Sequence, residues 1–149
     1  MLSTMTPHAS KLRIGRYSEA GRIYLVTTVV AERKRVFEDF SKAYGLVRLL
    51  REIEANALAE TLAFVVMPDH LHWLLSLGEK RSLSSVVGTL KSLSAHRLGR
   101  PIWQAGFHDH AMRQEEDLLA LARYVVANPL RAGLVKCLGE YPPWDAAWL

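Results

Sequence analysis

The pattern of apolar and polar positions predicts four strands. Residues 23–30 are rich in β-branched side chains, which favour the pleated, half-buried surface of a sheet. Residues 61–67 and 70–77 predict two further strands, joined by a tight turn at Pro68-Asp69, so that they pair as a hairpin. Residues 107–113 predict the fourth strand.

Three segments instead repeat their apolar residues at helical spacing. They cover residues 41–57, 84–98 and 114–128, and Ser41 is expected to cap the first of them. Gly99 follows the second helix, as glycine does where a helix ends. The third has acidic residues in its first turn, which the helix dipole favours.

The order of these elements predicts an α+β fold. Strand, helix, strand, strand, helix, strand is the order of a ferredoxin-like (RRM-like) βαββαβ antiparallel sheet, here followed by an extra C-terminal helix. Two helices would cover one sheet face and leave the other for a ligand, a metal or the extra helix. We expect one domain over residues 1–149, with a basic arm at 1–22 and an apolar tail at 133–149 that packs back on the domain.

Composition narrows the class of protein. Half of the 149 residues are hydrophobic and 23% are charged, which is typical of a globular chain. The apolar runs are too short to cross a bilayer and the N-terminus lacks a signal-peptide pattern, so we expect a cytoplasmic protein without a membrane partner. Cys137 is the only cysteine, which excludes an internal disulfide and a cysteine-based zinc site. The net charge of +4 permits a polyanionic partner.

Two histidines stand one residue apart where the third predicted strand begins. Side chains two positions apart on a strand point the same way, so His70 and His72 would present two imidazoles side by side. Imidazole is the commonest metal ligand among side chains, and such a pair is half of a metal site. Taken alone, this short motif is more typical of two histidines on a solvated strand face.

A second pair of polar residues lies on the last predicted helix. Tyr124 and Asn128 are four positions apart and therefore share a helix face. Tyrosine can act as a covalent nucleophile, and an amide oxygen suits a hard cation such as Mg²⁺ or Mn²⁺. The alternative is a core tyrosine and an asparagine that ends the helix before Pro129.

Both stretches resemble motifs of one family. Residues 67–75 (MPDHLHWLL) resemble the His-hydrophobic-His (HUH) motif of single-tyrosine transposases of the IS200/IS605 type. Residues 123–135 (RYVVANPLRAGLV) are similar to the tyrosine motif of their domesticated relatives, the REP-associated tyrosine transposases of bacteria. The resemblance extends to residues 15–17, 103–110 and 141–149 and so covers nearly the whole chain. Asp69 departs from it, because many relatives have asparagine before the first histidine.

The resemblance implies a fold and an activity. Such proteins have a ferredoxin-like domain and cut and rejoin single-stranded DNA next to a small imperfect hairpin. By position, His70, His72 and Asn128 would bind Mg²⁺ or Mn²⁺, and Tyr124 would attack the scissile phosphate to leave a 5′-phosphotyrosine and a free 3′-OH. The DNA partner would carry a REP-like hairpin. No nucleotide cofactor is expected, and a monomer is favoured while a dimer stays open.

Basic residues near these motifs are candidates for DNA binding. Lys91 is preferred because small residues surround it; the other candidates are Arg13, Arg16, Arg97 and Arg100. For each of them the alternative is a solvated surface charge. A second His-x-His pair, His108 and His110, would support the site from outside, contact DNA or be merely exposed. Two other functions stay open: a hairpin-binding protein without catalysis, and a metal-dependent hydrolase that activates water.

Overall fold

The computed structural model describes residues 20–112, 118–128 and 144–146. In chain order its elements are β1 (Ile23–Val29), η2 (Ala31–Arg33), η3 (Val36–Glu38), α1 (Phe40–Ala55), β2 (Ala59–Met67), β3 (His70–Leu77), α2 (Leu83–Leu98), β4 (His108–Ala111), α3 (Leu118–Val126) and β5 (Trp144–Ala146). The two η elements are short 3-10 helices between β1 and α1.

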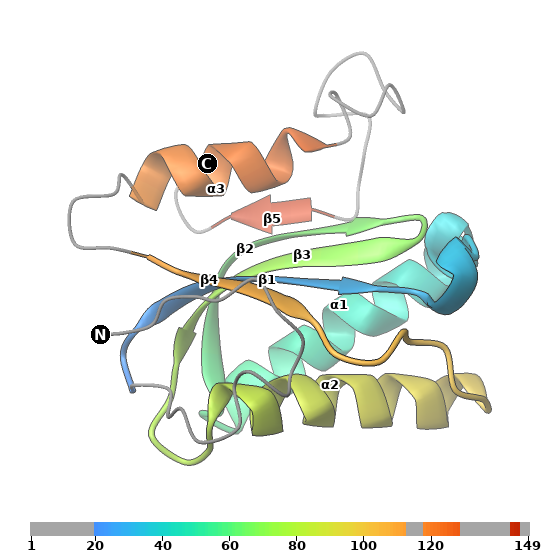
Figure 1. Ribbon diagram of the computed structural model, residues 1–149, viewed down its shortest axis with the longest axis horizontal. Coiled ribbons are helices and arrows are strands. Elements are labelled where there is room, and N and C mark those ends of the chain that lie inside the picture. Colours follow the sequence, from blue (N-terminus) through green and yellow to red (C-terminus); the bar gives the residue numbers. More distant parts are fainter. Residues whose placement is uncertain (1–19, 113–117, 129–143, 147–149) are drawn as a thin grey trace.

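The strands form one sheet in the order β4-β1-β3-β2-β5, in which all neighbours are antiparallel. Helices α1 and α2 lie on one face of this sheet, and α3 lies on the other (Figure 1). The α+β class and the βαββαβ order are therefore confirmed. Strand β5 was not expected, and it extends the sheet beyond β2 with three residues of the tail.

The helix boundaries follow local hydrogen bonding. The expectation that Ser41 caps α1 is wrong, because the N-cap is Asp39, whose carboxylate accepts a hydrogen bond from the Ser41 backbone N–H at 2.9 Å. Ser82 caps α2 in the same way. Gly99 ends α2 with a φ of 80°, a left-handed conformation that glycine adopts without strain. The acidic start expected for the last helix, residues 115–117, lies outside the described residues.

The sheet separates two apolar clusters. The larger cluster lies between the sheet and α1 and α2, and it includes Leu71, Trp73 and Leu75 of β3. The smaller cluster joins α3 to the opposite face through Ala122 and Val125. Because side chains alternate along a strand, β3 contributes every second residue to each face.

The β2–β3 hairpin positions the first histidine. Met67 pairs with His70 across the predicted turn at Pro68-Asp69, so His70 is the first residue of β3. Strand β3 is central in the sheet, with β1 on one side and β2 on the other. Within the described residues, no helix is long and apolar enough to cross a membrane.

Candidate functional site

His70 and His72 lie on the face of the sheet that α3 covers. Their cross-strand partners in β2 are Met67 and Val65, both members of the cluster that packs under α3. The intervening Leu71 is fully buried on the opposite face. The prediction that the two imidazoles share one strand face is consistent with this register.

The two imidazoles converge on one point. Their Nε2 atoms are 3.1 Å apart, and the ring planes meet at 86°. The Nδ1 atom of His70 lies 2.7 Å from Oδ1 of Asp69, and the Nδ1 atom of His72 lies 2.9 Å from the Thr27 hydroxyl oxygen. A carboxylate only accepts hydrogen bonds, so His70 donates from Nδ1, and in the neutral imidazole its Nε2 then carries the lone pair. The Thr27 hydroxyl can accept from His72 in the same manner.

This arrangement fits a divalent cation. Metal–ligand bonds to His nitrogen, or from Mg²⁺ to oxygen, are about 2.0–2.1 Å long, so two neighbouring ligands of one ion lie about 2.8–3.4 Å apart, from octahedral to tetrahedral geometry. The Nε2–Nε2 distance falls in this range, and two lone pairs at that distance repel unless a proton or a cation lies between them. Within the described part of the chain no three His, Cys, Asp or Glu residues cluster as a metal site, so a third ligand there would be of another type.

Asp69 connects the site to the segment after β1. Its Oδ2 atom accepts a hydrogen bond from Arg33 at 3.2 Å, while its Oδ1 atom faces His70. Burial raises the pKa of Asp69, but the hydrogen bond and charge of His70 and those of Arg33 outweigh burial. The pKa therefore lies below its ordinary value of 3.8, and the carboxylate stays ionised at neutral pH.

Helix α3 brings the tyrosine motif to the same face of the sheet. Its inner residues Ala122 and Val125 pack on β2 beside the cross-strand neighbours of the histidines, and the helix ends over the side of the sheet where β3 begins (Figure 1). Tyr124 is 50% exposed. Asn128 uses its amide nitrogen, at 3.0 Å from the Val125 carbonyl and 3.2 Å from the Tyr124 carbonyl, and so keeps its carbonyl oxygen as an acceptor. The roles of both residues stay predictions.

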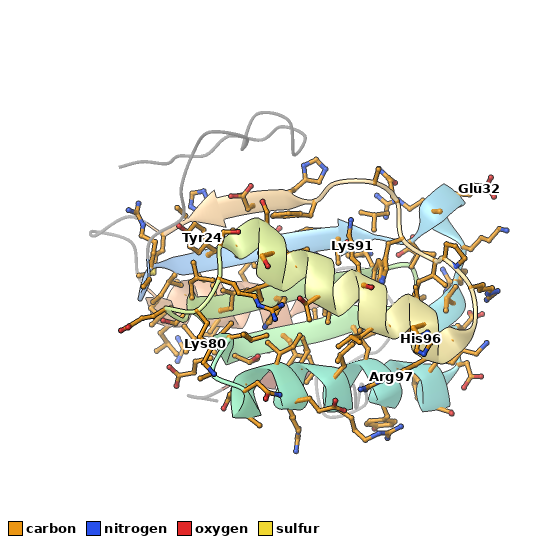
Figure 2. All side chains as sticks on the ribbon, turned by 90° about the horizontal axis from the view of Figure 1, so that it is seen from below. Tyr24, Glu32, Lys80, Lys91, His96 and Arg97 are labelled. Carbon is orange, nitrogen blue, oxygen red and sulfur yellow. The ribbon has the colours of Figure 1, made fainter. Side chains whose placement is uncertain are left out.

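Two of the DNA-binding candidates, Lys91 and Arg97, lie on α2 and form hydrogen bonds within the protein. Lys91 and Arg97 leave opposite flanks of the helix (Figure 2). Lys91 donates to the backbone carbonyls of Gln104 and Gly106, which ties the segment before β4 to α2. Arg97 forms two hydrogen bonds of 2.7 and 2.9 Å with Glu52 of α1. Their assignment to DNA stays a prediction, as does that of the exposed Arg100; Arg13 and Arg16 lie outside the described residues.

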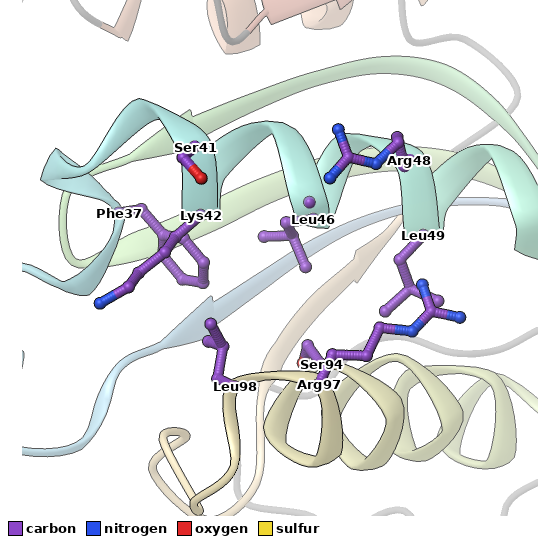
Figure 3. A pocket seen from close by; sticks show the side chains of 10 residues that line it. Phe37, Ser41, Lys42, Leu46, Arg48, Leu49, Ser94, Arg97 and Leu98 are labelled. Atoms are coloured by element: carbon purple, nitrogen blue, oxygen red, sulfur yellow. The ribbon is translucent and has the colours of Figure 1, made fainter.

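A basic cavity lies beside Arg97. It has a volume of about 210 Å³ and opens between α1 and α2, where three cationic side chains surround it (Figure 3). They are those of Lys42, Arg48 and Arg97, and the lining includes no acidic residue. Apolar residues also line the cavity, among them Phe37 and Leu46. Because Arg97 is already paired with Glu52, Lys42 and Arg48 supply the remaining positive charge of the lining.

The edge strand β4 carries the second histidine pair. His108 pairs across the sheet with Thr27, which in turn pairs with His72, so the three side chains follow one another on one face. His108 and His110 are exposed. His108 also borders a shallow cavity of about 150 Å³. Its place in the sheet is two strands from His72, so the backbones of β4 and β3 lie about 10 Å apart.

Sequence reasoning missed two residues of the site. Thr27 belongs to a strand that reads as purely structural, and Arg33 belongs to a charged loop. Neither has a local sequence signal, because each meets its partner only through strand pairing or through the course of a loop. The sequence marks Asp69 only as a departure from the family motif, and the structure supplies its contacts with Arg33 and His70.

The fold and the paired imidazoles define the class of the protein: an α+β domain with a His-x-His motif on a central strand and a helix over that face. The sequence model of the family described as "Transposase IS200 like" matches residues 20–127. The chain therefore belongs to this family of transposases, and the resemblance noted from its motifs is confirmed.

Individual relatives agree with this assignment. The REP-associated tyrosine transposase of Escherichia coli K12 is 30% identical over 131 residues, which cover 85% of this chain and 78% of the relative. The ISDra2 transposase TnpA of Deinococcus radiodurans is 41% identical over 56 residues, 38% of this chain and 40% of that protein. A solved structure of a REP-associated tyrosine transposase bound to a REP hairpin superposes with a TM-score of 0.73 at 26% identity, covering 87% of this chain and 79% of that one.

Proposed function

We propose that this chain is a metal-dependent endonuclease and strand transferase for single-stranded DNA that carries a REP-like hairpin. The observation that carries the proposal is the pair of imidazole Nε2 atoms 3.1 Å apart. The Nδ1 atom of His70 contacts the Asp69 carboxylate, and that of His72 contacts the Thr27 hydroxyl. Membership of a transposase family supports the reaction class, and the relative bound to a REP hairpin supports the substrate.

The proposed metal site consists of His70, His72 and the carbonyl oxygen of Asn128. Nitrogen and amide oxygen donors of this kind accept Mg²⁺ or Mn²⁺. When bound, the cation would neutralise charge that builds on the non-bridging oxygens of the phosphodiester. The two imidazoles need no rearrangement to bind it, because Asp69 and Thr27 already orient them.

Tyr124 is the proposed nucleophile. Its phenol oxygen attacks phosphorus, a P–O(Tyr) bond forms, and the bond from phosphorus to the 3′ oxygen of the preceding nucleotide breaks. The phenol loses its proton, the 3′ oxygen gains one, and the products are a 5′-phosphotyrosine and a free 3′-OH. Because the covalent bond conserves the energy of the phosphodiester, attack by a 3′-OH can reseal the strand without ATP. Half of the tyrosine surface is exposed, so DNA can reach it.

DNA affinity would come from the basic surface. We propose contacts from Arg13, Arg16, Lys91, Arg97 and Arg100, and the cavity between α1 and α2 adds Lys42 and Arg48 to this set. The histidines and α3 belong to one chain and one sheet face, which supports a monomer that cuts in cis. Binding should weaken steeply with salt, because each phosphate contact releases a counterion.

A covalent adduct tests the nucleophile directly. End-labelled hairpin DNA incubated with the protein and Mn²⁺ should give a slow band on a denaturing gel, and Tyr124→Phe should give neither band nor cleavage. The variant removes one oxygen from a half-exposed ring, so its free energy of unfolding should change by no more than about 1 kcal/mol. Hairpin binding, followed by fluorescence anisotropy, should persist.

Each other outcome of this experiment selects a different function. Cleavage without an adduct, or cleavage by Tyr124→Phe, would identify water as the nucleophile and a hydrolase. Hairpin binding without cleavage by the wild type would identify a recognition protein. Equal affinity for hairpin, linear single-stranded and duplex DNA would contradict hairpin recognition itself.

A further inference from the structure

The segment after β1 has a strained backbone next to the paired histidines. Glu32 and Arg33 both have positive φ, 59° and 56°, although neither is glycine. The left-handed region is unfavourable for L-residues because Cβ approaches the following carbonyl oxygen. Strain of this kind persists only where the surrounding structure enforces it, and it is frequent at functional sites.

Backbone hydrogen bonds hold this segment against the β2–β3 turn. The Val30 N–H donates to the Asp69 carbonyl and the Phe37 N–H donates to the Pro68 carbonyl, each at 2.9 Å. The segment is therefore fixed on both sides of the strained residues, at the turn that carries Asp69.

The strained conformation delivers the Arg33 guanidinium to Asp69. Its Nη1 atom lies 3.2 Å from Oδ2, and Oδ1 of the same carboxylate lies 2.7 Å from Nδ1 of His70. Arg33 is 64% exposed, and exposed ion pairs contribute little to folding. Arg35, two residues on, forms a comparable exposed pair with Glu38 at 3.1 Å, and that pair does not involve Asp69.

We infer that Arg33 is a positioning residue that acts on His70 through Asp69. The guanidinium holds one carboxylate oxygen, so the other faces Nδ1 of His70 and keeps the proton there. Nε2 then presents its lone pair beside that of His72. This inference rests on the proposed function only in assigning the pair to a metal, since the hydrogen bonds themselves are present without one. Outer partners of ligating histidines change metal affinity by about 10–100-fold.

The test compares Arg33→Asn with Arg35→Gln. Asparagine tolerates the left-handed region, so Arg33→Asn removes the guanidinium without adding strain, and Arg35→Gln removes a matched arginine from the same segment. Mn²⁺ binding is measured by calorimetry, without DNA. We expect Arg33→Asn to raise the Mn²⁺ dissociation constant about tenfold and Arg35→Gln to leave it unchanged, with equal melting temperatures.

The tautomer of His70 provides a second test, which is measured without metal. Ring ¹⁵N chemical shifts should report Nδ1–H for His70 in the wild type and in Arg35→Gln, and a mixture of tautomers in Arg33→Asn. An unchanged tautomer in Arg33→Asn would overturn the inference. If His70→Ala binds Mn²⁺ as well as the wild type, the metal assignment of the proposed function fails, while the tautomer still decides the role of Arg33.

Discussion

The two faces of the sheet are built from the same strands but differ in chemistry. The face under α1 and α2 is an apolar layer that includes Leu71, Trp73 and Leu75 of β3. The face under α3 has a smaller apolar cluster and, beside it, His70 and His72 with Thr27. Alternation along β3 therefore lets one strand contribute to the main core and to the candidate site at once.

The difference shows why the site can be rigid without being buried. Leu71 lies between the two histidines in sequence and is fully buried, so its packing fixes the backbone from which both imidazoles project. The histidines themselves are only partly buried and remain open to a ligand. Substitutions at neighbouring residues of β3 should therefore have different effects: those on the face under α1 and α2 lower stability, and those on the face under α3 lower activity.

The largest effects should come from substitutions of the adjacent residues Leu71 and His72. His72→Ala should abolish Mn²⁺-dependent cleavage and cost about 1 kcal/mol of unfolding free energy, the value of one hydrogen bond. Leu71→Ala should cost about 2–5 kcal/mol, because it opens a cavity in the main core. Chemical denaturation and a cleavage gel measure the two effects. Equal destabilisation by both variants would contradict the assignment of stability to one face of the sheet and of activity to the other.

Two adjacent threonines sharpen the comparison. Thr27 faces the histidines, whereas Thr28 is fully buried on the opposite face and its hydroxyl has no hydrogen-bond partner among the described residues. Thr27→Val should weaken Mn²⁺ binding about tenfold, because His72 loses the group that orients its ring. Thr28→Val should leave Mn²⁺ binding unchanged and raise stability by about 1 kcal/mol, since it removes an unsatisfied polar group.

Calorimetry and thermal melting would check the threonine pair. If Thr28→Val weakened Mn²⁺ binding as much as Thr27→Val, the effect would come from the strand as a whole. The orientation of His72 by the Thr27 hydroxyl would then be rejected.

The basic cavity tests whether the α1/α2 face has a role besides stability. Arg48 lines the cavity, whereas Arg51 is an exposed arginine of the same helix outside its lining. Arg48→Ala should lower the slope of log K against log salt by about 0.7 for single-stranded DNA, the value of one phosphate contact. Arg51→Ala should leave the slope near that of the wild type. Equal slopes in the two variants would remove the cavity from the DNA surface.

The smallest effect concerns the ion pair between α1 and α2. The hydrogen bond from Arg97 holds the pKa of Glu52 below its ordinary value of 4.5, with further contributions from the charges of Arg97 and Arg48 that together outweigh desolvation. A lowered folded-state pKa stabilises the fold above pH 4.5, and this contribution disappears as the pH falls through the folded value. Both groups are exposed, so the contribution is small.

Melting curves of wild type and Glu52→Gln would measure this contribution. The difference between the two melting temperatures should be largest near neutral pH and should shrink in acid. A difference that grows as the pH falls would show that the pair does not stabilise the helices through charge.

Several features of the fold could be predicted because their signals are local. The β-branched run of β1, the helical spacing of α1 and α2 and the Pro68-Asp69 turn each specify their own element, and the order of elements specifies the sheet. The capping residue of α1 was missed, because Asp39 and Ser41 are both good caps and only the hydrogen-bond geometry chooses between them.

Other features could not be predicted, because they depend on pairing across the chain. Strand β5 has three residues, and it forms only because β2 presents an open edge to it. Lys91 and Arg97 appeared as candidate phosphate contacts in the sequence, yet each hydrogen-bonds a group at least 13 residues distant along the chain. Such partners have no signature in the residues around a lysine or an arginine.

The sequence by itself determined the α+β order, the His-x-His pair on one strand face and the tyrosine motif, because spacing decides which side chains point together. Only the tertiary structure decided how the two imidazoles are held. Thr27 reaches His72 through the β1–β3 register, and Arg33 reaches Asp69 through a left-handed turn enforced by the β2–β3 hairpin. Both contacts join residues more than 30 positions apart, so they exist only once the chain has folded.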